Sequence, residues 1–457
     1  MNVDCKRVRH CALRLMVLAL VGALGGPLAA MTLSEVVAMA QDQDMQYRAA
    51  RRSLDASLEK LPQARAGLLP TINLNAGQNR QAGDAVFTDG VTIQREPVSW
   101  NWQLQLTQPL LRVSNWAAYR QSEAQVRQAE VQMLQAEHEL LLRTAQLYFD
   151  LALARESVRV LDAQLGAVKA LWVSAQRSYA VGSGTVTDVQ EAKAKHAASL
   201  AQRVAAANEV DTKLAELERM LGQPVDLPAL HMARSLPPLE NAQLRQLRKI
   251  AVTDNLGVRS AEAALEVAQR EVEKTRGQHL PTLDLVASRT VNYNSTSLSS
   301  PSDLESRVNA SQLGVQLSIP LYAGGATQSR LREALALQDK AAAELEGARR
   351  AALSQLSQAA SGVINGSAQV DALEESVQAS RSALEGNMIG LRVGTRVNPD
   401  VLNAQQQLFT AMRDLSKARI DTALQGLRLK AAAGTLQTSD LTALESLMDP
   451  LPLETQP

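Results

Sequence analysis

One short motif occurs twice in this chain. Residues 179–192 read YAVGSGTVTDVQEA, and residues 391–404 read LRVGTRVNPDVLNA. In both copies a valine-glycine pair comes first, and an aspartate, Asp188 or Asp400, follows six residues after the glycine. The stretches on either side favour long helices, so each copy is predicted to form the turn of a helical hairpin.

The residues of the two turns have a sufficient structural explanation. Gly182 and Gly394 suit a left-handed backbone where a helix stops and the chain reverses. Asp188 and Asp400 then fall in the first turn of the returning helix, where the helix dipole favours a carboxylate. A functional role would require, in addition, that these aspartates face a lumen.

The caps of the returning helices are predicted from residue type. Thr187 and Gln190 have the spacing of a capping box. In the second copy Asn398 is predicted as the N-cap, with Pro399 at the first helical position.

Other segments repeat at nearly the same interval as the two turns. Leu-Pro-Thr at 69–71 recurs at 280–282, and Pro-Leu at 109–110 recurs at 320–321, both 211 residues later. This spacing indicates an internal duplication. We predict a first repeat at 31–223, a linker at 224–238, a second repeat at 239–435 and a C-terminal segment at 436–457 that ends in a disordered tail.

Residues 1–30 have the layout of a secretory signal peptide. Basic residues precede an apolar run at 15–24, and small residues follow up to Ala30. The run is too short for a membrane-spanning helix. Cys5 and Cys11 are the two cysteines of the chain, so the mature protein is predicted to contain neither cysteine nor disulfide.

Composition disfavours nucleic-acid binding and catalysis. After residue 30 there are 43 Lys and Arg against 46 Asp and Glu, whereas nucleic acid requires a basic face. The five histidines show no metal-ligand spacing. Gly182-Ser183-Gly184 lacks the lysine of a phosphate-binding loop. We therefore predict no catalytic residue, no metal and no other cofactor.

Each half contains two segments in which apolar and polar residues alternate. We predict strands at about 70–83, 97–110, 281–294 and 306–320. Period-two alternation with Asn, Gln, Thr and Ser indicates one apolar and one wet face. Such strands are long enough to cross a bilayer when tilted, although alternation alone also fits a soluble two-layer sheet.

Four strands cannot close a membrane barrel, and open strand edges are not tolerated in lipid. If these strands form a barrel, several chains must share it. Two chains would supply eight strands and three would supply twelve, and the residues alone do not choose between them.

The helical stretches are too long for a single-domain core. No proline occurs between residues 112 and 179, and a helix of that length spans ~100 Å. Apolar residues recur every seven positions towards both turns, which indicates lateral packing of neighbouring helices. These residues are Val158, Leu165, Trp172 and Tyr179, and then Val370, Val377, Leu384 and Leu391.

These motifs resemble the TolC family of Gram-negative outer-membrane efflux channels over nearly the whole mature chain. The matching pieces are HLPTLDL at 279–285, IPLY at 319–322, VG at 181–182 with TDVQ at 187–190, and VGTR at 393–396 with DVL at 400–402. The resemblance implies an α+β membrane protein and a homotrimer. Its chains would share a 12-stranded transmembrane β-barrel, continued through the periplasm by an α-helical barrel of coiled-coil hairpins. The linker and the C-terminal segment would form an equatorial domain.

The resemblance also implies a gate where the turns close the periplasmic entrance. The family's gate arginine falls on Arg396, and its aspartate partner falls on Asp188. The family's tyrosine partner falls on Leu391, so that hydrogen bond is missing and a looser gate is expected.

Two entrance aspartates of the family fall on Asp400 and Asn403. Since Asn403 departs from the pattern, we infer that Glu191 in the first turn restores the carboxylate. The exposed residues of the turns would contact a periplasmic adaptor protein: Val181, Gly182, Ser183, Val393, Gly394 and Thr395.

The implied function is a non-enzymatic exit channel in the outer membrane, in contact with its lipid. It would receive substrates from an inner-membrane ABC or proton-driven pump through the adaptor. Type I protein secretion and multidrug efflux need the same duct, so the substrate stays open. Two alternatives are a periplasmic adaptor, disfavoured by two turns and four strands, and a coiled-coil scaffold, which leaves the strand at 97–110 unexplained.

Overall fold

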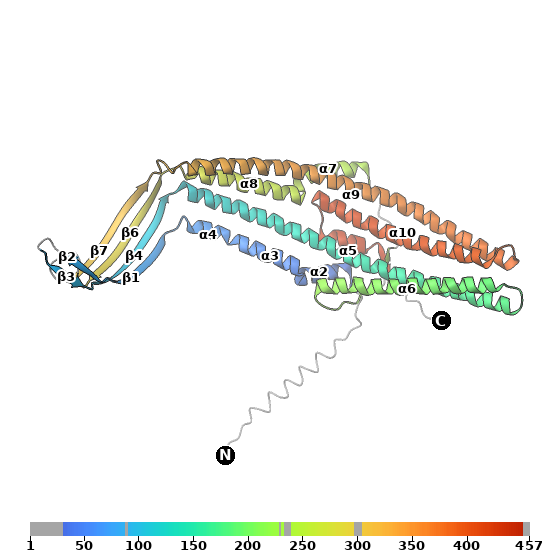
Figure 1. Ribbon diagram of the computed structural model, residues 1–457. Helices are drawn as coiled ribbons and strands as arrows, with labels where there is room; N and C mark the ends of the chain where they lie inside the picture. The colour runs from blue at the N-terminus through green and yellow to red at the C-terminus, as the bar shows by residue number, and fades with distance from the viewer. Residues whose placement is uncertain (1–30, 87–89, 228–229, 233–238, 297–303, 451–457) are drawn as a thin grey trace, which may run out of the picture. The chain divides into compact units, whose positions relative to one another are not determined.

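The computed structural model describes residues 31–86, 90–227, 230–232, 239–296 and 304–450 (Figure 1). It contains two compact units. Among the described residues, the strand unit is formed by those within Ala50–Leu134 and Leu256–Arg350, and the tip unit by those within Met1–Ala49, Gln135–Asn255 and Ala351–Pro457. The predicted signal peptide, the linker residues 228–229 and 233–238, and residues 451–457 of the C-terminal segment lie outside the described residues.

Corresponding elements of the two halves have the same order. Helices α5 (Val113–Ala180) and α9 (Ala326–Val393) each have 68 residues. Helices α6 (Val186–Leu221) and α10 (Asn398–Ala433) each have 36 residues. At ~1.5 Å per residue, α5 and α9 are each ~100 Å long, as the sequence predicted. None of the helices in the described ranges combines the length and apolar character needed to cross a bilayer.

The strand unit is built on a four-stranded antiparallel sheet in the order β1-β4-β6-β7. The strands are β1 (Thr71–Arg80), β4 (Val98–Leu111), β6 (Thr282–Asn294) and β7 (Ser306–Ser318). Three of them lie within the segments where alternation predicted strands, and β4 ends one residue beyond its predicted segment at 97–110. Between β1 and β4, β2 (Gly83–Val86) and β3 (Thr92–Arg95) form a separate hairpin.

The strand pairing places polar and apolar residues in separate rows across the sheet. Residues directly opposite one another point to the same face. One row across the four strands is polar throughout, Asn73–Gln105–Ser288–Gln312, and the neighbouring row is apolar, Ile72–Leu106–Ala287–Leu313. The apolar face is open in one chain, since Ile72 is 64% and Leu313 is 75% exposed.

An ion pair connects the point where β4 continues into α5 with the neighbouring strand β6. Arg112 Nε lies 2.9 Å from Asp284 Oδ1, and Arg112 Nη2 lies 2.5 Å from Asp284 Oδ2. The Asp284 side chain is only 10% exposed. Helix α8 (Leu256–Gly277) reaches the same junction, and a Cβ on Gly277 would lie 2.8 Å from the Ser114 nitrogen. The junction therefore depends on a bidentate ion pair and on the close approach of the Gly277 backbone to the start of α5.

The tip unit has its own hydrophobic core, assembled from α5, α6 and α10 with two short helices. These are α2 (Leu33–Gln43) and α11 (Thr438–Glu445), whereas α7 (Asn241–Asp254) packs on a separate, smaller cluster. Tyr148, Phe149, Leu217 and Leu427 are almost fully buried in the main core. Strand β5 (Leu230–Met232), from the predicted linker, pairs with β8 (Met448–Pro450), from the C-terminal segment.

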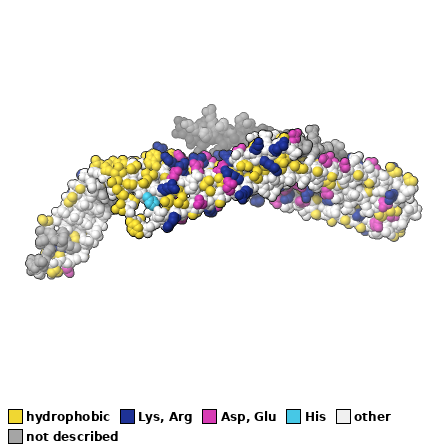
Figure 2. Space-filling view, turned by 90° about the horizontal axis from the view of Figure 1, so that it is seen from above, with side chains coloured by type: hydrophobic (Ala, Val, Ile, Leu, Met, Phe, Trp, Pro, Cys, Tyr) yellow, Lys and Arg dark blue, Asp and Glu magenta, His cyan; other side chains and the backbone are white. Residues whose placement is uncertain are grey.

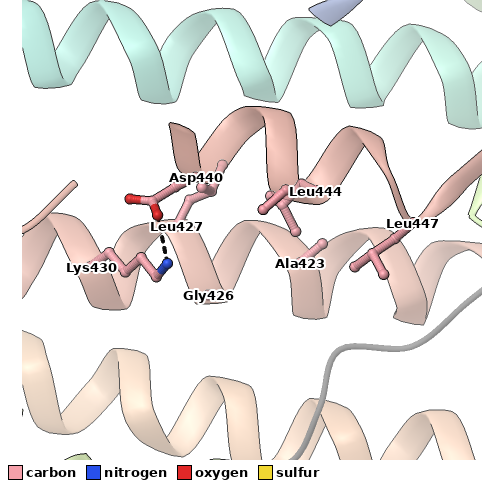
Figure 3. A pocket seen from close by; sticks show the side chains of 8 residues that line it. Ala423, Gly426, Leu427, Lys430, Asp440, Leu444 and Leu447 are labelled. Atoms are coloured by element: carbon pink, nitrogen blue, oxygen red, sulfur yellow. Dashed lines mark hydrogen bonds and ion pairs between the residues drawn. The ribbon is translucent and has the colours of Figure 1, made fainter. Parts of the chain in front are cut away.

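An apolar cavity of about 260 Å³ lies between α10 and α11 in the tip unit. Leu427 of α10 and Leu444 of α11 point into it, and Leu447 follows α11 at one end (Figure 3). Lys430 Nζ lies 2.6 Å from Asp440 Oδ1 at the other end. The lining is apolar except for this ion pair.

Candidate functional site

Both hairpin turns of the tip unit have the same backbone structure. Gly182 has φ 76° and Gly394 has φ 84°, which confirms the predicted left-handed positions. The N–H of Ser183 donates to the carbonyl of Ser178 at 2.9 Å, and the N–H of Thr395 donates to that of Gly390 at 2.9 Å. The N–H of Gly182 donates to the carbonyl of Tyr179, and that of Gly394 to the carbonyl of Leu391. Together these bonds form the Schellman motif that ends a helix.

The first returning helix, α6, begins with a capping box that the sequence analysis misplaced. Thr185 is the N-cap, and its Oγ1 accepts the N–H of Asp188 at 3.1 Å. Asp188 Oδ2 accepts the N–H of Thr185 at 3.1 Å and its hydroxyl at 2.7 Å. The predicted box of Thr187 and Gln190 is therefore wrong.

The second returning helix, α10, begins one residue earlier than predicted. Val397 is the N-cap, so Asn398 is the first helical residue and Pro399 the second. Val397 has no side-chain oxygen, and only half of a capping box forms: Asp400 Oδ2 accepts the Val397 N–H at 3.4 Å. In both turns the cap follows the left-handed glycine by three residues, so the distance from the glycine decides its position.

The charges at the turns form local contacts within one chain. Arg396 Nη1 lies 3.8 Å from Asp400 Oδ2, with side chains that are 58% and 38% exposed. A pair as exposed as this contributes at most ~1 kcal/mol. Among the described residues of one chain, Asp188 and Arg396 do not pair. Their contact stays a prediction.

The remaining predicted gate residues lie close to the turns. Glu191 and Asn403 are exposed, on the second turns of α6 and α10, and Leu391 is half-buried near the end of α9. Within the described ranges, no group of three or more His, Cys, Asp or Glu residues could hold a metal ion.

Apolar side chains project from both turns. Val181 is 79% and Val393 is 72% exposed, and both were predicted to contact an adaptor. Val186 and Val397 are also 54% and 59% exposed, and sequence reasoning missed them. Both valines follow a turn glycine, Gly182 or Gly394, closely in the sequence. This position could have identified them as exposed residues of the turns. Clustered exposed apolar residues are typical of a protein-contact surface.

The capping box of α6 gives a direct test of how the first turn is built. Thr185→Val removes the cap hydroxyl but keeps the side-chain shape, and should cost ~1 kcal/mol locally. Amide hydrogen exchange at residues 186–188 should therefore become about fivefold faster. Thr187→Val, inside α6, is the control. Faster exchange in the control but not in Thr185→Val would contradict this assignment.

Known proteins are similar to this chain along most of its length. The family described as outer membrane efflux protein matches residues 36–223 and 247–435. The proteases secretion protein PrtF of Dickeya chrysanthemi is 31% identical over 94% of this chain and 94% of its own length. The outer membrane protein TolC of Vibrio cholerae is 31% identical over 94% of this chain and 96% of its own.

Solved structures share the fold at lower identity. The outer membrane protein VceC of Vibrio cholerae superposes with a TM-score of 0.73 and 19% identity, covering 88% of this chain and 96% of its own. The CmeC outer membrane channel of Campylobacter jejuni superposes with a TM-score of 0.73 and 17% identity, covering 93% of this chain and 90% of its own.

Proposed function

Because this chain belongs to the outer membrane efflux protein family, we propose that three copies of it form one exit channel. The chain is an outer-membrane export channel that extends into the periplasm, and its family consists of channel proteins rather than enzymes. It passes substrates from an inner-membrane pump and a periplasmic adaptor to the outside. In the proposed trimer each chain contributes four strands to a shared 12-stranded barrel.

The edges and faces of the sheet support the shared barrel. In the described sheet β1 and β7 each have a strand neighbour on one side only. In lipid their free edges need a partner, which a second copy would supply. The polar row through Gln105 would then line the water-filled interior, and the apolar row through Leu106 would face lipid.

A band of apolar side chains next to the sheet supports contact with lipid. Figure 2 shows hydrophobic side chains gathered where the helices of the strand unit begin, beside a sheet with few charges. Leu321 is 91% and Tyr322 is 88% exposed after β7, and Leu280 is 44% exposed before β6. Aromatic and aliphatic residues of this kind are typical of a membrane boundary.

The proposal includes the internal duplication, with repeats at 31–223 and 239–435. The family matches the chain in two segments, and the long helices of the two halves have equal lengths. Pairing of β5 with β8 supports an equatorial domain made from the linker and the C-terminal segment. The exposed valines of the turns are the surface proposed to receive the adaptor.

We favour protein secretion over drug efflux as the task of this channel. PrtF, a proteases secretion protein, is 31% identical, and AprF of Pseudomonas aeruginosa, an alkaline protease secretion protein, is 30% identical. Efflux is the second candidate, because the family is described as outer membrane efflux protein and the outer membrane efflux protein BepC of Brucella suis is 26% identical.

An export assay tests the proposed task. Cells without an exit channel receive this chain together with the ABC pump, adaptor and protease of a type I system. Protease in the medium would support secretion, whereas restored drug resistance alone would favour efflux. Neither effect, with the protein present in the outer membrane, would contradict the proposal.

The gate would combine contacts between chains with a ring of charge. In a trimer Asp188 of one chain would pair with Arg396 of the next, and three copies of Asp400, with Glu191, would surround the entrance. Rings of carboxylates favour cations and repel anions. With Leu391 in place of the family's tyrosine, the closed state lacks one hydrogen bond.

Single-channel recording checks this gate. The wild-type channel should be cation-selective, and Asp400→Asn should reduce the cation-to-anion permeability ratio severalfold because the ring loses its charge. Asp400→Glu, which keeps the carboxylate, should retain the ratio. Arg396→Ser should raise the resting conductance. Anion selectivity of the wild type, or no rise in Arg396→Ser, would count against the gate.

A further inference from the structure

The apolar face of the four-stranded sheet carries charge only away from the helices. Residues two positions apart in a strand point to the same face, so the strand pairing assigns every second residue to this face. Within the four paired strands the face has no Asp or Glu, and its charged residues are Arg80, Arg289 and Arg307. All three lie in the half of the sheet farther from the helices, whereas the nearer half is mainly aliphatic.

Aromatic side chains lie on the same half of this face. Trp100 is opposite Tyr293, and their rings stack with centroids 5.5 Å apart and planes at 21°. Arg307 is the partner of Tyr293 on the other side. Trp102 lies one row nearer the helices, opposite Val291, which is only 3% exposed. Rings with a polar tip are typical of the boundary between hydrocarbon and water.

Two of the three arginines form no ion pair among the described residues. Arg80 pairs with Glu96. Arg289 has a neutral partner, because its Nη1 donates to Ser311 Oγ at 2.6 Å. Arg307 is exposed, and the nearby Glu305 carboxylate accepts a hydrogen bond from Tyr293 instead. The guanidinium groups of Arg289 and Arg307 are therefore available to an anion from outside the chain. We call Arg289, Arg307, Trp100, Trp102 and Tyr293 the arginine–aromatic patch.

The position of Arg289 along its strand makes an external anion necessary. Arg289 lies seven residues from Thr282, the end of β6 next to the helices. At ~3.3 Å per residue and a tilt of ~40°, its Cα lies ~18 Å into an apolar band that is ~25 Å tall. A charge at this depth destabilises a barrel in lipid unless the side chain reaches the interface and meets a counter-charge. Arg307, in the row of Tyr293, lies closer to that interface.

The orientation of the sheet identifies the leaflet. Helices α5 and α9 follow the sheet at one end, and the channel extends into the periplasm on that side. The arginine–aromatic patch therefore lies towards the outer leaflet of the proposed barrel. In a Gram-negative outer membrane this leaflet is made of lipopolysaccharide, a glycolipid with phosphate groups above its acyl chains.

We infer that the arginine–aromatic patch of each chain binds lipopolysaccharide of the outer leaflet through its phosphate groups. A guanidinium group binds phosphate through two parallel charge-assisted hydrogen bonds. Trp102 and Val291 offer the acyl chains an apolar surface below the arginines. The inference rests on the proposed function, since this face meets lipid only in the shared barrel. Pairing of β7 with β1 of a second copy would leave the patch on the outer surface.

Binding of fluorescent lipopolysaccharide to the full-length trimer in detergent tests the patch. Arg289→Gln with Arg307→Gln should weaken binding about tenfold or more, because charge-assisted contacts with phosphate are lost. The control is Arg48→Gln with Arg51→Gln on α3 (Met45–Leu58), which removes the same charge from exposed positions outside the sheet. It should bind as tightly as wild type.

Two further ligands identify what the patch recognises. Dephosphorylated lipopolysaccharide should bind wild type about tenfold more weakly than the intact lipid. Inorganic phosphate at the same concentration as the lipid should not displace it, because a free anion lacks the acyl chains. Equal binding of the intact lipid by wild type and the glutamine variant would overturn the inference. Equal binding of the dephosphorylated lipid, or displacement by inorganic phosphate, would do the same.

A conservative variant separates the patch from a loss of folding. Arg289→Lys with Arg307→Lys keeps both charges but loses the bidentate geometry, so its affinity should be severalfold lower than that of wild type. If the glutamine variant forms no trimers, the lysine variant decides, and wild-type affinity would overturn the inference. A wild-type protein that forms no trimers would instead contradict the proposed function.

Discussion

Gly434→Ala is expected to destabilise the tip unit by about 2–5 kcal/mol, a large effect for the addition of one methyl group. Gly434 caps α10 with φ 76°, where a side chain costs ~1 kcal/mol or more. A Cβ there would also lie 2.1 Å from the carbonyl oxygen of Asp254. That backbone has little freedom to move, because Asn255 Nδ2 donates to the Ala432 carbonyl at 2.8 Å.

The first half supplies a matched control for this substitution. Gly222 caps α6 with φ 72°, and a Cβ there would meet nothing within 4 Å. Gly222→Ala should therefore show only the backbone penalty, ~1 kcal/mol, or roughly 2–4 °C in melting temperature followed by circular dichroism in detergent. Gly434→Ala should melt several degrees lower still. Equal shifts for the two variants would contradict the close approach of Asp254.

Arg112→Ala is expected to cost about 2–4 kcal/mol, because it leaves the Asp284 carboxylate without its two donors. Asp284 is 10% exposed, so water does not replace the guanidinium fully, whereas the 37% exposure of Arg112 keeps the cost from being larger. The loss falls where β4 continues into α5. A lower melting temperature and a smaller yield of folded protein in the membrane fraction would both follow.

A double substitution and an exposed pair provide the controls for Arg112→Ala. Asp284→Asn in the Arg112→Ala background should recover part of the loss, since it removes the unpaired charge. Arg127→Ala breaks the pair with Glu266, whose side chains are 49% and 32% exposed, and should cost at most ~1 kcal/mol. A cost for Arg127→Ala equal to that of Arg112→Ala would contradict the special role of Asp284.

Periodic features of the chain could be predicted from sequence because they repeat over many residues. The sheet strands appear where apolar residues such as Leu104 and Leu106 alternate with glutamines. Long helices appear where proline is absent. Gly182 and Gly394 were predictable because a chain reversal at a helix end requires a left-handed residue.

Contacts decided by one or two residues could not be predicted in the same way. Cap residues were assigned by type, but the backbone places Thr185 and Val397 three residues after the glycine. Arg396 pairs with Asp400 because both lie at the start of one helix. The contact of Leu402 with Val168 and Ala192 joins residues far apart in sequence, and no periodic pattern marks it.

The mass of the mature protein extracted from the outer membrane in detergent, measured by light scattering with the detergent contribution removed, tests the shared channel most directly. A particle of three chains is the predicted result, because the described sheet has two free edges for neighbouring copies to close and the family resemblance implies twelve strands in all. A single chain that stays soluble when the detergent is removed would contradict the channel.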